Sequence, residues 1–187
     1  GAWILALNAH AYGDEVSRAQ AVDILCGYAE RYRSYRPADG RARKPGRATF
    51  QSLDEAVWLL PLVRAYDLLR DRIDTERCQR IERDLLRPAA DHIRCQRFES
   101  IHNIECWHNA ALAAVGLCLD DAELVHTALD GEFGFLHQLE EGVRADGLWW
   151  EGSLSYHYYA TAALLTTTQV AEPVRSSLIE CPRLQRM

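Results

Sequence analysis

The sequence predicts an all-α protein built from antiparallel helix pairs. Apolar residues recur at helical spacing through most of the chain, several of these segments have recognisable start signals, and no convincing run alternates apolar and polar residues as a strand would. About seven predicted helices are too many for a compact four-helix bundle. We therefore expect part of an (α/α) toroid, in which helical hairpins pack in a curved layer.

The first two helices have clear sequence signals. The first follows Asp14, carries apolar residues such as Leu25 at helical spacing, and ends in the Pro-, Gly- and Arg-rich stretch 32–47. The second begins at Ser52 and Glu55, which have the S-x-x-E spacing of a capping box. These signals predict an antiparallel pair joined by a long polar loop.

The later helices follow from the same apolar spacing. They are expected over residues 75–95, 106–120, 122–129, 133–143 and 155–172. Thr75 is the expected cap of the first of these. Pro61 and Pro88 should kink the second and third helices of the chain, because proline lacks the N–H that a helix interior needs.

Length and composition narrow the classes of protein. The chain has 187 residues, of which 48% are hydrophobic and 26% charged, as in a globular domain or a large piece of one. The net charge of −6 argues against nucleic-acid binding. No apolar run reaches the roughly 18 residues that a membrane span needs, and residues 2–10 lack the basic start of a signal peptide. Six scattered cysteines predict buried thiols rather than a disulfide framework.

Aromatic and polar residues gather in the stretch DGLWWEGSLSYHYYA, residues 146–160. If Ser153 or Ser155 caps a helix, Tyr156 lies in its first turn, where backbone N–H groups and the helix dipole favour a phenolate. A tyrosine there suits acid–base catalysis, and His157 adjoins it. The two tryptophans offer flat faces for sugar rings. The alternative interpretation is that these aromatic residues only seal the helix start against the core.

A second polar cluster, ESIHNIECWHNAAL, precedes an apolar run. At helical spacing His102, Glu105 and Asn109 share a face, which favours a helix end that borders a cleft. Capping or surface roles are the alternative. A metal site that also used Cys106 and His108 is conceivable, but the spacing matches no strong ligand pattern, and we expect no metal in this chain.

A basic stretch lies between the first two predicted helices. A solvated loop is the simplest interpretation, and a cationic lip for an anionic ligand is the functional one, since an acidic chain needs a local positive patch. We expect this lip on the same side of the domain as Tyr156. Its cations are Arg36, Arg41, Arg43, Lys44 and Arg47, against one acid, Asp39.

The segments NIECWHNAALAAVG and FGFLHQLEEGVRADGLWWEGSLSYHYYA resemble the heparinase II/III-like polysaccharide lyases, including the oligoalginate lyases. The most specific piece is D-G-x-x-x-E-G-S-x-x-Y-H at residues 146–157. The resemblance implies β-elimination of heparin-like or alginate-like uronic-acid chains. It implies Tyr156 as the catalytic tyrosine, with His102 or Asn103 neutralising the sugar carboxylate. His102 and Tyr156 are 156 − 102 = 54 residues apart, an interval of the kind that the family has.

The resemblance also bears on what lies outside the chain. It implies a β-sandwich domain after the toroid, with another active-site histidine and in some members a structural metal. We expect residues 1–187 to be a single, incomplete toroid domain without that β-sandwich, to need no cofactor of its own, and to bind an anionic polysaccharide or oligosaccharide. The side chains expected to contact this substrate are Glu105, His108, His157, Trp150, Glu151 and Arg47.

Elimination suits these residue types. Hydrogen bonds to the uronate carboxylate stabilise a developing enolate, a base removes the C5 proton, and an acid protonates the leaving glycosidic oxygen. Tyr156 can supply the acid and, for suitable stereochemistry, the base as well. Two alternatives stay open. A toroidal glycoside hydrolase would use two carboxylates, such as Glu151 with Glu105 or Asp54 with Glu55, and a helical carbohydrate-binding or interaction domain would need none.

Overall fold

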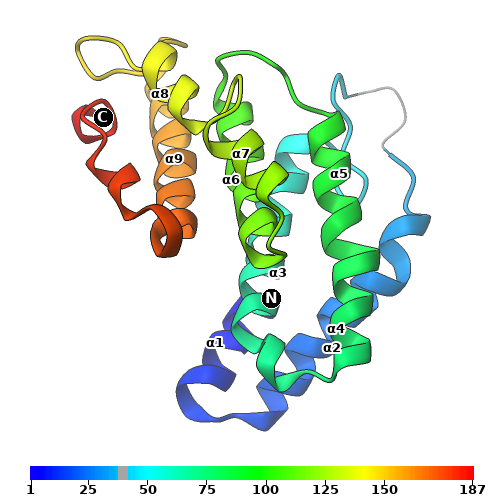
Figure 1. Ribbon diagram of the computed structural model, residues 1–187. Helices are drawn as coiled ribbons and strands as arrows, with labels where there is room; N and C mark the ends of the chain where they lie inside the picture. The colour runs from blue at the N-terminus through cyan, green and yellow to red at the C-terminus, as the bar shows by residue number, and fades with distance from the viewer. Residues whose placement is uncertain (38–41) are drawn as a thin grey trace. The chain divides into compact units, whose positions relative to one another are not determined.

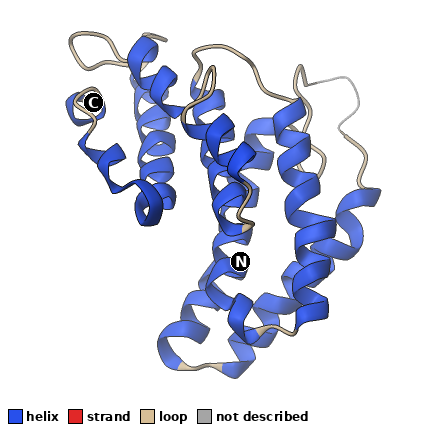
Figure 2. Cartoon of the chain, in the orientation of Figure 1, coloured by secondary structure: helices blue, strands red, loops and turns tan. Residues whose placement is uncertain are grey.

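The protein is built from helices. The computed structural model describes residues 1–37 and 42–187, so Arg41 and Asp39 of the basic stretch lie outside the described residues. Figure 2 shows helices joined by loops, and the described residues contain two isolated β-bridges but no strand. The all-α prediction is therefore confirmed. The chain divides into two compact units, Gly1–Cys95 and Gln96–Met187.

Unit 1 contains the first five helices. α1 and α2 pack against each other across the short turn at Gly13 and Asp14, so they form an antiparallel pair (Figure 1). Asp14 caps α2 as expected, because its carboxylate accepts hydrogen bonds from two N–H groups of the first turn. The elements are α1 (Ala2–Tyr12), α2 (Glu15–Arg31), α3 (Ser52–Leu69), α4 (Thr75–Ile81), a π-helical segment (Glu82–Leu86) and α5 (Arg87–Cys95).

The start of α3 is not the expected capping box. Gln51 is the N-cap residue, and Ser52 already belongs to the helix. The fully buried carboxylate of Glu55 accepts hydrogen bonds from the three backbone N–H groups of residues 47–49 and from the hydroxyl of Tyr32 at 2.7 Å. Glu55 therefore fixes a neighbouring loop, because that loop offers it more donors than the start of its own helix.

The helix that follows was expected to be capped by Thr75, but the cap is Asp74. The chain then runs through α4, the π-helical segment and α5 without interruption. The N–H of Arg87 donates to the carbonyl of Glu82, five residues back. This wider turn comes directly before Pro88, whose missing N–H and bulky ring disturb the regular pattern.

Unit 2 contains α6 (Asn103–Cys118), α7 (Ala122–Leu129), α8 (Phe135–Gly142) and α9 (Leu154–Arg175). The bounds of α7 are those expected from the sequence. α6 and α7 pack together across a three-residue link, so they run antiparallel (Figure 1). The side of α6 rich in alanine is fully buried, and these small side chains allow neighbouring helices to approach closely. α6 also packs along α9.

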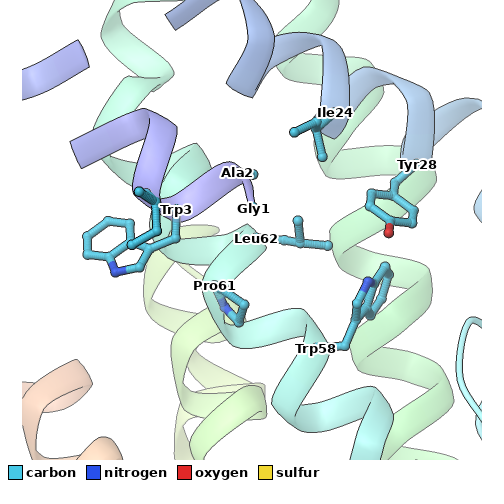
Figure 3. A pocket seen from close by; sticks show the side chains of 9 residues that line it. Gly1, Ala2, Trp3, Ile24, Tyr28, Trp58, Pro61 and Leu62 are labelled. Atoms are coloured by element: carbon cyan, nitrogen blue, oxygen red, sulfur yellow. The ribbon is translucent and has the colours of Figure 1, made fainter. Parts of the chain in front are cut away.

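Unit 1 contains an apolar hollow of about 500 Å³, partly open to solvent, between α1, α2 and α3. Figure 3 shows Trp3, Tyr28, Trp58 and Leu62 around it. Among the described residues that line it there is no carboxylate, histidine or arginine, so it offers little for acid–base chemistry. The polar groups that the sequence singled out for catalysis lie in unit 2.

Two further properties concern the whole chain. No disulfide joins any of the six cysteines, all of which lie in described residues, and three of them are buried. Within residues 1–37 and 42–187, no helix combines the length and the apolar content needed to cross a bilayer.

Candidate functional site

A tight turn leads from α8 into α9. Val143 and Trp149 form an isolated antiparallel bridge, and the carboxylate of Asp146 accepts a hydrogen bond from the N–H of Leu148 at 3.0 Å. Gly147 has φ of 84° and Gly152 has φ of 74°, in the left-handed region that side-chain-bearing residues rarely adopt. The two glycines of D-G-x-x-x-E-G-S are therefore the residues that let the chain turn twice before the helix.

The two adjacent tryptophans of this turn have opposite surroundings. Trp149 is almost fully buried against Gly142, where an added Cβ would lie 2.3 Å from the Trp149 ring. Trp150 keeps 43% of its surface exposed. Of the two rings, only Trp150 is therefore accessible for stacking on a sugar, while Trp149 belongs to the packing of the turn.

Glu151 connects this turn to the start of α6. Its carboxylate accepts hydrogen bonds from the indole N–H of Trp149 at 2.6 Å, from the backbone N–H of Asn103 at 2.9 Å, and from the side-chain amide of Asn103 at 2.8 and 3.0 Å. The Nε2 atom of His102 lies 3.9 Å from the same carboxylate. The Glu151 side chain is only 11% exposed, so its main role here is to hold two segments together.

His102 is the N-cap residue of α6. Its Nδ1 accepts the N–H of Ile104 at 3.1 Å, and its own backbone N–H donates to the side chain of Gln138 at 3.1 Å. Phe98 stacks on the imidazole ring, with the ring centres 4.9 Å apart. The imidazole is thus fixed from two sides while 30% of the side chain stays exposed.

The starts of α6 and α9 lie side by side. Glu151, just before α9, holds Asn103 at the first position of α6. Further along both helices, the rings of Trp107 and Tyr159 are in contact, with their centres 5.2 Å apart. These two contacts follow the same order along both segments, so the helices run in the same direction. Their positive dipole ends therefore lie together, an arrangement that favours anions.

Tyr156 lies in the first turn of α9, as expected, and Ser153 is the cap of that helix. At helical spacing, Tyr156 continues the buried stripe of Ala160, Ala163 and Thr167. Those three residues are fully buried, whereas Tyr156 is 50% exposed. The packed face of α9 therefore ends in an accessible tyrosine in the first turn of that helix.

Glu105 and His108 do not lie at a surface, contrary to what was expected of residues that contact a substrate. Both side chains are fully buried, and Nδ1 of His108 lies 3.3 Å from the Glu105 carboxylate. Arg97 forms an ion pair with Glu105 and also donates to the side chain of Asn109 at 3.1 Å. Direct contact of Glu105 or His108 with a sugar does not fit this geometry, because both side chains belong to a buried network of charged groups rather than to the wall of a cleft.

His157 is also buried, with 5% of its surface exposed. Its Nδ1 accepts the backbone N–H of Trp149 at 3.2 Å, which ties the turn to the first turn of α9. The helical period explains this position, because His157 is followed at seven residues by the buried Leu164. The expected contact of His157 with substrate does not fit this position either.

Two supporting residues were missed by the sequence reasoning. Arg97 belongs to no recognisable sequence motif, and only its buried ion pair with Glu105 shows that it supports this part of the structure. Gln138 is fully buried and donates to the carbonyl groups of Ser100 and Phe133, while its side-chain oxygen accepts the N–H of His102. No spacing signal marks either residue, since both act across distances of many residues in the chain.

The electrostatics favour charged carboxylates at both positions. Burial raises the pKa of Glu105, but the hydrogen bond and charge of His108 and the charge of Arg97 outweigh it, so the pKa lies below its ordinary value. Burial likewise raises the pKa of Glu151, and the hydrogen bonds from Trp149 and Asn103 bring it below its ordinary value. Both groups therefore stay ionised near neutral pH.

Arg47 and the basic stretch belong to unit 1. Arg47 donates to the carbonyl groups of Arg33 at 3.3 Å and Tyr35 at 3.4 Å, and its guanidinium lies 5.8 Å from the centre of the Tyr32 ring. Its position on the same side of the domain as Tyr156 stays a prediction. Among described residues, no group of three or more His, Cys, Asp or Glu side chains converges on a position for a metal ion.

Comparison with known proteins identifies relatives. Residues 68–185 match the family model described as alginate lyase. The chain is 34% identical over 168 residues to an alginate lyase of Stenotrophomonas maltophilia (strain K279a), across 86% of this chain and 22% of that protein. It is 33% identical over 174 residues to an exo-oligoalginate lyase of Saccharophagus degradans (strain 2-40), across 88% of this chain and 23% of that protein.

The chain spans less than a quarter of the length of these two relatives. The matched region nevertheless takes in every element of unit 2 that builds the site, from His102 and Asn103 to Glu151 and Tyr156. Because the family model matches more than half of the chain, and both relatives match it over most of its length, the chain belongs to the alginate lyase family.

Proposed function

We propose that the natural protein containing this chain cleaves alginate, or oligosaccharides derived from it, by β-elimination. The observation that carries the proposal is the parallel pairing of α6 and α9, with Glu151 tying the start of one helix to the turn before the other. This pairing supports a site in which His102 and Tyr156 act on one sugar ring. Both named relatives are alginate or oligoalginate lyases, and neither supports the heparin-like substrate.

Of the two candidates for the sugar carboxylate, exposure favours His102. The side-chain amide of Asn103 donates to both oxygens of Glu151, and only 4% of Asn103 is exposed. The side chain of His102 is 30% exposed; its Nδ1 accepts the N–H of Ile104, and its Nε2 lies 3.9 Å from the Glu151 carboxylate. Asn103 then supports the site by connecting α6 to Glu151.

The reaction follows from these positions. A hydrogen bond from His102 to the uronate carboxylate stabilises the enolate that forms when the C5 proton leaves. The electron pair of the C5–H bond becomes the C4–C5 double bond, and the bond from C4 to the glycosidic oxygen breaks. The C5 proton is taken by a base, either the phenolate of Tyr156 or a group outside this chain, and the hydroxyl of Tyr156 protonates the leaving oxygen. Trp150, with its exposed ring, supplies a stacking face for a neighbouring sugar.

The arrangement of the whole protein is part of the same proposal. Residues 1–187 form part of an (α/α) toroid, the described basic residues Arg36, Arg43, Lys44 and Arg47 of unit 1 supply positive charge for an anionic chain, and a β-sandwich domain lies elsewhere in the natural protein. An anionic substrate needs such a local group of cations, because the chain as a whole has a net charge of −6 and would otherwise repel it.

The test is an assay of the natural protein on alginate, mannuronate and guluronate oligosaccharides, and heparin. An increase in ultraviolet absorbance from the unsaturated uronate, with alginate substrates only, is the expected result. New reducing ends without that absorbance would favour a glycoside hydrolase. The buried, ion-paired Glu105 argues against that outcome, since it is not accessible as one of two catalytic carboxylates.

A further inference from the structure

We infer that His102 is held with its ring proton on Nε2, and that it serves the elimination as a fixed hydrogen-bond donor rather than as the base. This inference rests on the proposed lyase function and adds to it, because a carboxylate-binding histidine could in principle also remove the C5 proton. The inference depends on which ring nitrogen is already engaged.

The first constraint comes from helix α6. Nδ1 of His102 accepts the backbone N–H of Ile104 at 3.1 Å. A neutral imidazole has one nitrogen that donates and one that accepts, so an accepting Nδ1 places the proton on Nε2. Histidine is not among the preferred N-cap residues, and Ser, Asp or Asn would cap α6 at least equally well. What an imidazole adds at this position is a second nitrogen.

The second constraint comes from Glu151. Its carboxylate lies 3.9 Å from Nε2, so a proton on that nitrogen is favoured over a lone pair. At 3.9 Å the N–H does not form a direct hydrogen bond with the carboxylate and is available to another acceptor. Glu151 is itself held by Trp149 and Asn103, and this makes it a positioning residue for His102.

The third constraint is the position of the ring. Phe98 stacks on the imidazole at a centre-to-centre distance of 4.9 Å and an angle of 24°. A half-turn of the ring that exchanged its two edges would leave the Ile104 N–H without its acceptor, which is costly at a half-buried helix start. Ring stacking, helix capping and a nearby charge thus favour the same tautomer.

The chemical consequence concerns the source and the destination of the protons. A neutral imidazole whose Nε2 already carries hydrogen cannot accept the C5 proton at that nitrogen. His102 therefore keeps its proton and donates a hydrogen bond to the carboxylate throughout the reaction. In one route Tyr156 begins as a phenolate, takes the C5 proton and then, as a hydroxyl, gives it to the leaving oxygen. In the other route a group outside this chain takes the C5 proton, and the Tyr156 hydroxyl gives its own proton to the leaving oxygen and becomes a phenolate.

Three substitutions at one position separate the two roles in the natural protein. His102→Asn keeps an acceptor for the cap and an N–H donor, His102→Asp keeps only the acceptor, and His102→Ala keeps neither. We expect kcat/KM for the asparagine variant to fall by no more than about tenfold. We expect it to fall by about 100- to 1,000-fold for both of the others, as when one donor to a developing oxyanion is lost.

The three variants also control one another. The alanine variant excludes repulsion by the new carboxylate as the sole cause of the aspartate result. The melting temperature of the asparagine variant should stay close to that of the parent. Alanine should lower it because the cap is lost, and aspartate should lower it because a second carboxylate then lies near Glu151. An asparagine variant as inactive as aspartate, with an unchanged melting temperature, would overturn the inference, because it would mean that the reaction needs the proton exchange of a histidine.

A direct measurement does not depend on activity. Nitrogen-15 NMR of the natural protein, in mildly alkaline solution, distinguishes the protonated from the unprotonated ring nitrogen, and loss of the signals in His102→Asn assigns them. We expect an unprotonated Nδ1 and a protonated Nε2. The opposite pattern would refute the inference. Absence of elimination by the parent protein on every uronic-acid polymer would refute the proposed function instead, while the NMR result still tests the tautomer.

Discussion

Glu151 shows how a single side chain can join two sequence motifs. Its oxygens accept hydrogen bonds from Trp149, two residues before it, and from Asn103, which is 48 residues away. The negative charge also sits at the N-terminal end of α6, where the helix dipole stabilises it. Substitution of this residue should therefore disturb the position of His102 as well as the turn that leads to Tyr156.

Replacement of Tyr156 by phenylalanine tests the catalytic role most directly. The change deletes the hydroxyl and keeps the ring of a residue that is 50% exposed and is not the cap of α9. In the natural protein, kcat should fall by about 100-fold or more, because general acid–base catalysis contributes on the order of 10²–10⁴. KM should change little. Tyr158→Phe, on a neighbouring exposed tyrosine, is the control and should keep its activity. Full activity of the Tyr156 variant would contradict the proposed role.

Some residues of the site were predictable and others were not. The place of Tyr156 in the first turn of a helix was predictable, because Ser153 and Ser155 both mark a helix start, and the structure shows that Ser153 is the cap. Its catalytic role stays a prediction. Glu105 and His108 share a helix face with polar neighbours, and that spacing is the same whether the face borders a cleft or a buried charge. Only the ion pair with Arg97, eight residues earlier and without any motif, decides between the two.

At the scale of elements, the turn between α8 and α9 depends on a close approach. An added Cβ on Gly142 would lie 2.3 Å from the Trp149 ring. We expect Gly142→Ala to destabilise the protein by about 1–3 kcal/mol, because overpacking forces the ring to move. The displacement of Trp149 should also lower kcat/KM, since Trp149 donates to Glu151. Thermal unfolding and the elimination assay measure both effects.

Gly27→Ala is the matched control for this prediction. Gly27 lies inside α2, and an added Cβ there would meet only a flexible arginine side chain, at 3.4 Å. The substitution should raise stability by about 0.5–1 kcal/mol, because alanine favours the helix. Equal effects of the two substitutions would mean that the close packing of Gly142 has no energetic importance.

The loop before α3 supports a second prediction at this scale. Glu55 is fully buried and accepts from the three N–H groups of residues 47–49 and from Tyr32. We expect Glu55→Gln to cost about 1–3 kcal/mol, because its amide N–H₂ would face donors and leave a buried group unsatisfied. Tyr32→Phe removes one donor and leaves the other bonds in place, so it should cost less. Denaturant unfolding measures both, and a larger cost for Tyr32→Phe would contradict this account.

Helices were easier to predict than their ends. α7 has the expected bounds, because Asp121 caps it and its apolar period is regular. The S-x-x-E pattern at Ser52 and Glu55 misled, since a capping box and a loop-binding carboxylate have the same spacing. Only the folded loop supplies the donors that distinguish them. The pairing of the starts of α6 and α9 was not predictable either, because the sequence does not show which helices are neighbours in the folded protein.

At the scale of the whole molecule, acid should weaken the fold. The pKa values of Glu105 and Glu151 lie below the ordinary value of 4.5 in the folded protein, through the causes given above. A lowered folded pKa stabilises the protein fully above the unfolded pKa, and this stabilisation is lost as pH falls through that value towards the folded pKa. The melting temperature should therefore decrease as the pH is lowered from about 6 to about 3.

Glu151→Gln separates one contribution from the rest. The variant cannot lose a charge at this position, so its melting temperature should be lower than that of the parent near neutral pH but should depend less on pH. Part of the dependence should remain, because Glu105 and the carboxylates of Asp14 and Asp84 also have lowered pKa values. Parallel curves for parent and variant between about pH 6 and pH 3 would contradict the prediction, since Glu151 would then have the same pKa folded and unfolded.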